Sequence, residues 1–118
     1  LAEAPSDPDV LRLALRLAER QGDPAAALAF GRRWLAERPD DRGAQWELGS
    51  RLLAAPGAGL RSEGRRLLWP LVLREGVHRE SAGALLARDP GVTRGEKEML
   101  RRELRQGEVA PELRAQLD

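Results

Sequence analysis

The chain has 118 residues, and 42% of them are apolar, which is enough for one domain whose core needs no metal or disulfide. It has no cysteine, which excludes thiol chemistry, cysteine-based metal sites and redox switching. Basic and acidic residues nearly cancel to a net charge of +1, so composition does not indicate a protein dominated by contacts to nucleic-acid phosphates.

A tight helical hairpin is predicted at the start of the chain. Asp7 supplies an N-cap and Pro8 a first-turn proline, and apolar residues then recur at helical spacing. Gly22 can end this helix in the left-handed conformation. Asp23 can cap the next helix, and Pro24 fits its first turn, where the missing N–H of proline costs nothing. The two helices are therefore joined by a very short turn.

The second and third helices are predicted from the breakers that follow. The helix that starts at Pro24 runs to about Arg38 and ends before Pro39. The Asp pair at 40–41 can cap a third helix, which ends at the Pro-Gly pair at 56–57.

A fourth helix is predicted from about residue 62 to residue 75. It follows residues 57–59, Gly-Ala-Gly, which lack the Lys-Ser/Thr of a nucleotide-binding loop and which we interpret as a flexible connection. Pro70 lies inside this helix, where it removes one hydrogen bond at a cost of roughly 3 kcal/mol. We therefore expect a kink near Leu67 or a local break.

The rest of the chain is predicted to hold two more helices and a short tail helix. Helices are expected at about 78–88 and 94–106, the second opened by a capping box in which Thr93 and Glu96 bond each other's backbone N–H groups. A tail helix near 111–117 can close the stack. No strand-length segment alternates with a period of two, and aromatic and β-branched residues are scarce, so the predicted fold class is all-α.

The apolar positions of these helices define a predicted core. It consists of Leu11, Leu15, Leu28, Phe30, Trp34, Leu35, Leu48, Leu52, Leu67, Leu71 and Leu85. Trp34 is large for a contact between helices, and we expect the nearby small residue Gly31 to make room for it.

One set of positions in the first hairpin follows a known pattern. Its apolar, turn and closing residues are Leu11, Ala14, Leu15, Ala18, Gly22, Asp23, Ala27, Leu28 and Pro39. The pattern resembles the tetratricopeptide repeat (TPR), a helix-turn-helix unit of about 34 residues that stacks into a superhelix. A shift by 34 residues puts Leu48 and Gly49 on the family's Leu-Gly pair and Leu52 on its next buried position.

The resemblance implies a single domain over 1–118, built from antiparallel helical hairpins stacked as a short right-handed superhelix. Its units are repeat 1 at about 7–39, repeat 2 at 40–76 with a longer loop, a degenerate repeat 3 at 77–107 and a tail helix at 108–118. A three-residue insertion in the loop at 58–63 is needed to keep the second unit aligned. A helical bundle without repeats is the alternative.

The resemblance also implies which residues face the inner, concave wall. These are Asp9, Arg12, Arg16, Glu19 and Arg20 from the first unit and Trp46, Ser50 and Leu53 from the second. Arg12 and Arg16 lie one turn apart, so their guanidinium groups can together hold a carboxylate, from an acidic side chain or a C-terminus. Trp46 can supply an apolar anchor. Family members that clamp a peptide C-terminus have Lys and Asn where this chain has Arg12 and Arg16, so that particular clamp is not present.

These residues predict a non-catalytic protein–protein interaction or scaffolding module that binds a partner segment in its concave surface. In one alternative the arginines only solvate a helix and Trp46 fills the seam between repeats. In another, the chain is a structural or self-association domain of a larger bacterial protein. Trp69 is its candidate residue, because it lies at an outward position of a nearly all-apolar helix that 109–117, another copy or a neighbouring domain must cover.

No catalytic residue, cofactor or metal site is predicted. The single histidine, His78, is interpreted as a surface or capping residue without a second histidine for a metal pair. Nucleic-acid binding is not expected, because the arginines that would support it lack interleaved aromatic residues apart from Trp69. Those arginines are Arg61, Arg65, Arg66, Arg74 and Arg79.

No membrane span is expected, since arginines interrupt every leucine-rich stretch. The chain starts at Leu1 without a leader, so we expect a fragment of a longer protein, and its compartment stays open. Lys97 is the only lysine among 20 basic residues, a bias typical of GC-rich bacterial genomes.

Overall fold

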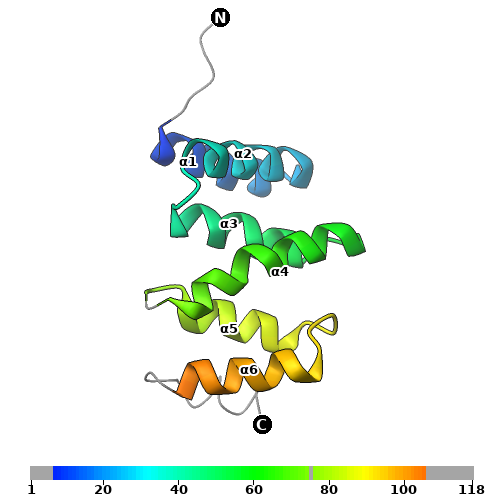
Figure 1. The fold of residues 1–118 in the computed structure, drawn as a ribbon. Helices are drawn as coiled ribbons and strands as arrows, with labels where there is room; N and C mark the ends of the chain where they lie inside the picture. The colour runs from blue at the N-terminus through cyan, green and yellow to red at the C-terminus, as the bar shows by residue number, and fades with distance from the viewer. Residues whose placement is uncertain (1–6, 75, 106–118) are drawn as a thin grey trace, which may run out of the picture.

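The computed structural model describes residues 7–74 and 76–105, and within them the chain forms six α-helices and no strand (Figure 1). The helices are α1 (Pro8–Arg20), α2 (Pro24–Glu37), α3 (Arg42–Leu53), α4 (Ala58–Leu73), α5 (Arg79–Arg88) and α6 (Arg94–Arg105). The all-α prediction is therefore confirmed for the described part of the chain. The predicted tail helix near 111–117 lies outside it.

The helices follow one another from one end of the molecule to the other. Each packs against the next in sequence, most extensively α1 against α2 and α3 against α4. Contacts also join α3 to α5 and α4 to α6. Figure 1 shows the result as three successive layers, with α1 and α2 at one end and α6 at the other.

The first turn forms as the sequence predicts. Gly22 has a φ of +76°, in the left-handed region that favours glycine. The Asp7 and Asp23 carboxylates each accept a hydrogen bond from a backbone N–H in the first turn of the helix they cap, that of Asp9 at 2.8 Å and that of Ala26 at 3.0 Å. These caps satisfy donors that a helix start leaves without partners. Local chemistry thus fixes both helix starts of this hairpin.

The core is divided among three clusters along the stack. Leu15, Ala18 and Ala27 form one between α1 and α2. Leu11, Trp34 and Ala44 form the next, which includes α3. The largest joins α4, α5 and α6, and its buried residues are Leu68, Leu71, Val72, Ala82, Leu86, Ala87, Val92, Leu100 and Leu104.

The predicted core is only partly the observed one. Buried residues among those predicted are Leu11, Leu15, Trp34, Leu48, Leu52 and Leu71. The remaining predicted residues are half-buried, namely Leu28, Phe30, Leu35, Leu67 and Leu85. On α4 and α5 the inner position is taken by the leucine next along the chain, Leu68 for Leu67 and Leu86 for Leu85.

Two glycines allow the closest contacts between helices. A Cβ atom on Gly64 of α4 would lie 2.7 Å from the Leu53 backbone nitrogen and 2.8 Å from the Gly49 carbonyl oxygen of α3. Gly31 of α2 faces Leu48 and Leu15, and the expectation that it makes room for Trp34 is wrong. The Trp34 ring instead lies against Gly43, and its Nε1 donates to the Asp41 Oδ2 at 3.0 Å.

The start of α4 differs from the prediction. Gly57 is its N-cap, and Ala58 and Gly59 lie in its first turn, so residues 57–59 do not form a flexible connection. The chain between α3 and α4 is therefore short, and the residues at 58–63, where the insertion was predicted, lie within α4. Further along, α4 continues through Pro70 without ending, and its ribbon changes direction between its two halves (Figure 1).

The predicted capping box at the start of α6 is confirmed. The Glu96 Oε1 accepts from the Thr93 backbone N–H at 2.8 Å, and the Thr93 Oγ1 accepts from the Glu96 backbone N–H at 3.1 Å. The two residues thus satisfy each other's donors at the helix N-terminus.

We predict that Thr93→Ala lowers the free energy of unfolding by about 1 kcal/mol, because the Glu96 amide loses its acceptor. Urea denaturation followed by circular dichroism measures this change. Thr93→Ser keeps the hydroxyl and is expected to leave most of the stability in place. Equal losses in both variants would contradict a role for the hydroxyl.

Candidate functional site

Side chains of α1, α3 and the start of α5 surround a cleft of about 290 Å³. It is lined by Pro8, Asp9, Arg12, Arg16, Trp34, Asp41, Gly43, Trp46, Glu47 and His78. Asp9, Arg12, Arg16 and Trp46 were predicted to share one wall, and they line this cleft together.

An aromatic pair forms the apolar side of the cleft. The rings of Trp46 and His78 stack with their centroids 5.6 Å apart and an angle of 14° between their planes. His78 is the N-cap residue of α5, but its side chain makes no capping hydrogen bond there. The sequence interpretation of His78 as a surface or capping residue therefore missed its contact with α3. Stacking holds Trp46 in place as part of the cleft wall.

A chain of ion pairs joins α1 to α3 beside the aromatic pair. The Glu47 side chain, which is 10% exposed, accepts from the Arg16 Nη2 at 2.6 Å and from the Arg51 Nη1 at 2.5 Å. Arg51 in turn donates from its Nε to the Glu19 Oε2 at 2.5 Å. Two arginines and two glutamates thus neutralise one another across the helix interface.

The charged forms of this network are stabilised by its geometry. Burial raises the pKa of the Glu47 carboxyl, but hydrogen bonds from Arg16 and Arg51, together with their positive charges, outweigh burial and bring that pKa below its ordinary value. Burial lowers the pKa of Arg51. Hydrogen bonds from Arg51 to Glu19 and Glu47, together with their negative charges, raise it by more than burial lowers it, so the net shift of this pKa is upward. Both groups are held ionised.

The two arginines predicted to hold a partner's carboxylate together have different surroundings. Arg16 donates from both its Nε and its Nη2 to the Glu47 Oε1, so a carboxylate of the chain itself already occupies that face of its guanidinium group. Arg12 makes a longer contact, 3.5 Å, with Asp9. Its side chain is 47% exposed and that of Arg16 is 55% exposed, so the two arginines differ in how tightly they are paired and not in how far they are buried. Arg12 is therefore the less tightly paired cation of the cleft.

The four other predicted wall residues lie elsewhere. Glu19 pairs with Arg51 at the far side of the ionic network and does not line this cleft. Ser50 donates from its Oγ to the Glu47 carbonyl at 3.3 Å and faces a separate hollow with Leu53. Arg20 is exposed at the end of α1, away from the cleft.

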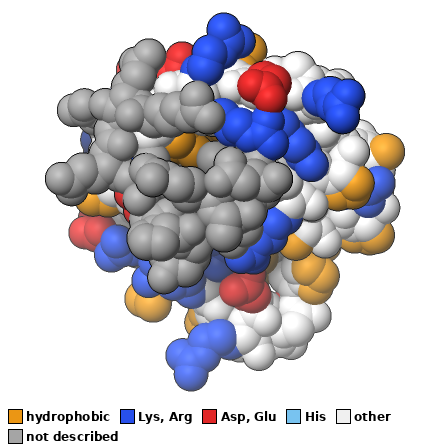
Figure 2. Space-filling view, turned by 90° about the horizontal axis from the view of Figure 1, so that it is seen from below, with side chains coloured by type: hydrophobic (Ala, Val, Ile, Leu, Met, Phe, Trp, Pro, Cys, Tyr) orange, Lys and Arg blue, Asp and Glu red, His pale blue; other side chains and the backbone are white. Residues whose placement is uncertain are grey.

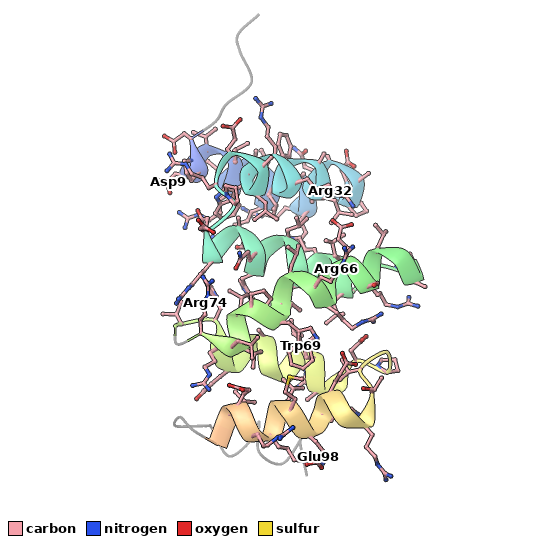
Figure 3. The ribbon with its side chains drawn as sticks, viewed as in Figure 1. Asp9, Arg32, Arg66, Trp69, Arg74 and Glu98 are labelled. Carbon is pink, nitrogen blue, oxygen red and sulfur yellow. The ribbon has the colours of Figure 1, made fainter. Side chains whose placement is uncertain are left out.

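Trp69, the residue predicted for self-association, packs inside the molecule. It is half-buried and lies against the cluster that joins α4, α5 and α6. Figure 3 shows its side chain directed from α4 toward the α5 and α6 layer. Part of its side chain is therefore packed against this cluster, and residues 109–117, the predicted cover, lie outside the described part of the chain.

Most of the arginines considered for nucleic-acid binding are held by intramolecular contacts. Arg61 donates to the Pro56 carbonyl at 2.8 Å, Arg65 to the Asp89 carboxylate at 2.7 Å, and Arg79 to the Val72 carbonyl at 3.0 Å. Seen from the α6 end, Lys and Arg side chains are scattered over the coloured surface with Asp and Glu side chains between them (Figure 2).

Within residues 7–74 and 76–105, the part of the chain that the structure describes, no group of three His, Asp or Glu side chains could hold a metal ion. None of the helices in this part is long and apolar enough to cross a membrane. Comparisons with protein-family models, curated proteins and solved structures found no match to the chain.

Proposed function

We propose that the chain is a TPR-like helical-repeat module without catalytic activity, and that its cleft between α1, α3 and α5 binds a segment of a partner protein. The supporting observation is that Arg12 of α1, Trp46 of α3 and His78, the N-cap residue of α5, meet at this cleft, with the two rings stacked. A cation beside an aromatic surface suits a peptide that carries both a carboxylate and an apolar side chain.

Regular offsets along the chain support the repeat interpretation. The N-caps of α1 and α3, Asp7 and Asp41, are 34 positions apart, and so are those of α2 and α4, Asp23 and Gly57. Ion pairs between neighbouring hairpins join residues separated by nearly the same interval. These pairs are Arg16 with Glu47 and Arg32 with Glu63, each 31 apart, and Glu19 with Arg51, 32 apart. A near-constant interval is the signature of stacked repeats.

The state of the ionisable groups supports binding rather than catalysis. A general acid or base works best with a pKa near the operating pH and a proton it can exchange. The pKa of the Glu47 carboxyl is lowered and that of the Arg51 guanidinium is raised, so both groups are held in their charged forms. Ion pairing of this kind fixes helices against each other and leaves Arg12, whose contact with Asp9 is 3.5 Å long, to meet a ligand.

The partner segment is expected to carry a free carboxylate, from an acidic side chain or a C-terminus. Arg12 is the group that such a carboxylate can reach without displacing Glu47 from Arg16. An apolar side chain of the same segment would then lie on Trp46. The cleft is small, so only a few residues of the partner enter it.

We predict that Arg12→Glu lowers binding of carboxylate-bearing peptides at least about tenfold, since it replaces attraction with repulsion and removes charge-assisted hydrogen bonds. The measurement is retention of the chain on an immobilised library of peptides with free C-termini, with fluorescence titration of the peptides retained. The same peptides with amidated C-termini separate a terminal carboxylate from an acidic side chain.

The matched control is Arg66→Glu, because Arg66 is an exposed arginine on α4 and does not line the cleft (Figure 3). Its peptide binding is expected to match that of the original chain. Far-ultraviolet circular dichroism confirms that both variants keep their helices. Retention of no peptide at all, or equal losses in both variants, would refute binding at the cleft.

A further inference from the structure

An apolar stripe runs along the outer face of α1. Val10, Leu13 and Leu17 recur at intervals of three and four residues, so they share one side of the helix. They are 44%, 68% and 51% exposed, although the other face of α1 is fully packed on α2. The stripe lies outside the cleft, and α1 belongs to the end layer of the stack (Figure 1). No described helix covers this side of α1.

The corresponding face of α3 is covered. Positions 34 residues after the stripe are Ala44, Glu47 and Arg51. Ala44 is fully buried in a cluster with Trp34 of α2, and the other two form ion pairs with α1. The face of α3 that matches the stripe is therefore the face on which the preceding hairpin, α1 with α2, is stacked.

The same face of α5 is covered at two of its three positions. A second step of 34 residues leads to His78, Ser81 and Leu85. His78 stacks on Trp46 of α3, Leu85 packs against the cluster that contains α4, and Ser81 is exposed. The first helix of each later hairpin thus uses this face to contact the hairpin before it, whereas in α1 all three positions carry large, apolar, exposed side chains.

An open apolar face at the end of a stack indicates an interface without its partner. Terminal units of repeat proteins need a polar outer face to stay soluble, whereas this one presents three large apolar side chains. We propose that the stripe is a docking site for a further helical hairpin that is not part of the described chain. It would stack on α1 as α1 and α2 stack on α3. The inference uses the repeat stacking of the proposed function but does not require that the cleft binds a peptide.

The stripe also specifies the chemistry of the docking hairpin. Glu47 and Arg51 of α3 meet Arg16 and Glu19 of the preceding hairpin, and the residues that match them in α1 are Leu13 and Leu17. Two charged residues placed opposite these leucines would be desolvated without partners. The docking hairpin is therefore expected to carry apolar residues at the positions that match Arg16 and Glu19.

A repeat insertion tests this proposal on the full chain. A second copy of residues 8–41 is placed before Pro8, so that the added Asp41 takes the place of Asp7 as the N-cap of α1. In the added copy alone, Arg16→Leu and Glu19→Leu supply the apolar match. We expect one cooperative unfolding transition, with a steeper slope in urea and a midpoint at least about 0.5 M higher than in the parent chain.

Two further versions decide whether the stripe itself is responsible. In the first version the added copy keeps its own Arg16 and Glu19, which then face Leu13 and Leu17 of the original α1. The increase in the urea midpoint should be largely lost. In the second version, Leu13→Glu and Leu17→Arg in the original α1 recreate the charges that Glu47 and Arg51 place on α3. The increase in the urea midpoint should then return. Two separate transitions, or the same midpoint in all versions, would overturn the proposal.

The parent chain provides a last check on which occupant the stripe accepts. Sedimentation over a concentration series should show a monomer. A dimer that Leu13→Glu abolishes would assign the stripe to a second copy and overturn docking of a separate hairpin. Peptide capture at Arg12 is measured on the same proteins, so failure of the stripe and failure of the cleft are seen separately.

Discussion

Gly64→Ala is expected to lower the free energy of unfolding by about 2 kcal/mol, although alanine favours helices by up to about 1 kcal/mol over glycine. The new Cβ would lie 2.7 Å from the Leu53 nitrogen and 2.8 Å from the Gly49 oxygen. Both are backbone atoms of α3, so no side-chain rotation can relieve the overlap. The two helices of the most extensively packed pair would have to separate, and the surrounding core would lose its close packing.

Gly59→Ala is the matched control on the same helix. Gly59 lies in the first turn of α4, and a Cβ atom there has nothing within 4 Å. The same substitution should therefore raise the free energy of unfolding by about 0.5 kcal/mol. Urea denaturation of both variants, followed by circular dichroism, measures the two changes. A neutral or stabilising Gly64→Ala would contradict the close approach of α3 and α4.

The parts of the fold that the sequence predicts well are those set by local chemistry. The left-handed Gly22, the Asp23 cap and the Thr93–Glu96 capping box each involve residues within a few positions of one another. Their backbone partners follow from the helix geometry alone. The α1–α2 hairpin and the start of α6 were therefore predictable from the chain.

The start and the inner face of α4 were not predictable in the same way. Gly59 has low intrinsic helix propensity, but in the fold it lies in the first turn of α4, because packing of the helix on α3 outweighs propensity. Leu67 and Leu68 are equally apolar, and the positions of the neighbouring helices decide which of them is buried. Gly64 gives the useful signal in retrospect, since it marks the line of closest contact between the two helices.

The candidate site was predicted as a set of residues but not as a set of contacts. A shared wall for Arg12, Arg16 and Trp46 follows from helical spacing and the repeat interval, and all three line the cleft. The partners of Arg16 and Trp46, which are Glu47 and His78, lie 31 and 32 positions further along. Pairs at the repeat interval are the signal that would have found them.

Glu47→Gln is expected to lower the free energy of unfolding at neutral pH by about 2 kcal/mol. Glutamine keeps the shape of the side chain but removes the charge that faces Arg16 and Arg51, and loss of charge-assisted hydrogen bonds in a buried setting costs about 1.5–3 kcal/mol. The control is Glu63→Gln, which breaks another pair at the same interval, with Arg32. The Glu63 side chain is 31% exposed, against 10% for Glu47, so a loss below about 1 kcal/mol is expected.

The stability difference between the original chain and Glu47→Gln should also depend on pH, with a sign set by the lowered pKa of Glu47. A carboxyl whose folded pKa lies below its ordinary value of 4.5 contributes its full stabilisation above that value and loses it as the pH falls through the folded pKa. Arg51, with a raised pKa, contributes unchanged over this range. Glutamine does not titrate, so the difference between the two proteins isolates Glu47. Urea denaturation of both from pH 7 to about pH 3 should show a difference that is constant above pH 4.5 and shrinks below it. A difference that stayed constant to the acid end, or grew there, would mean that Glu47 is not held ionised by Arg16 and Arg51.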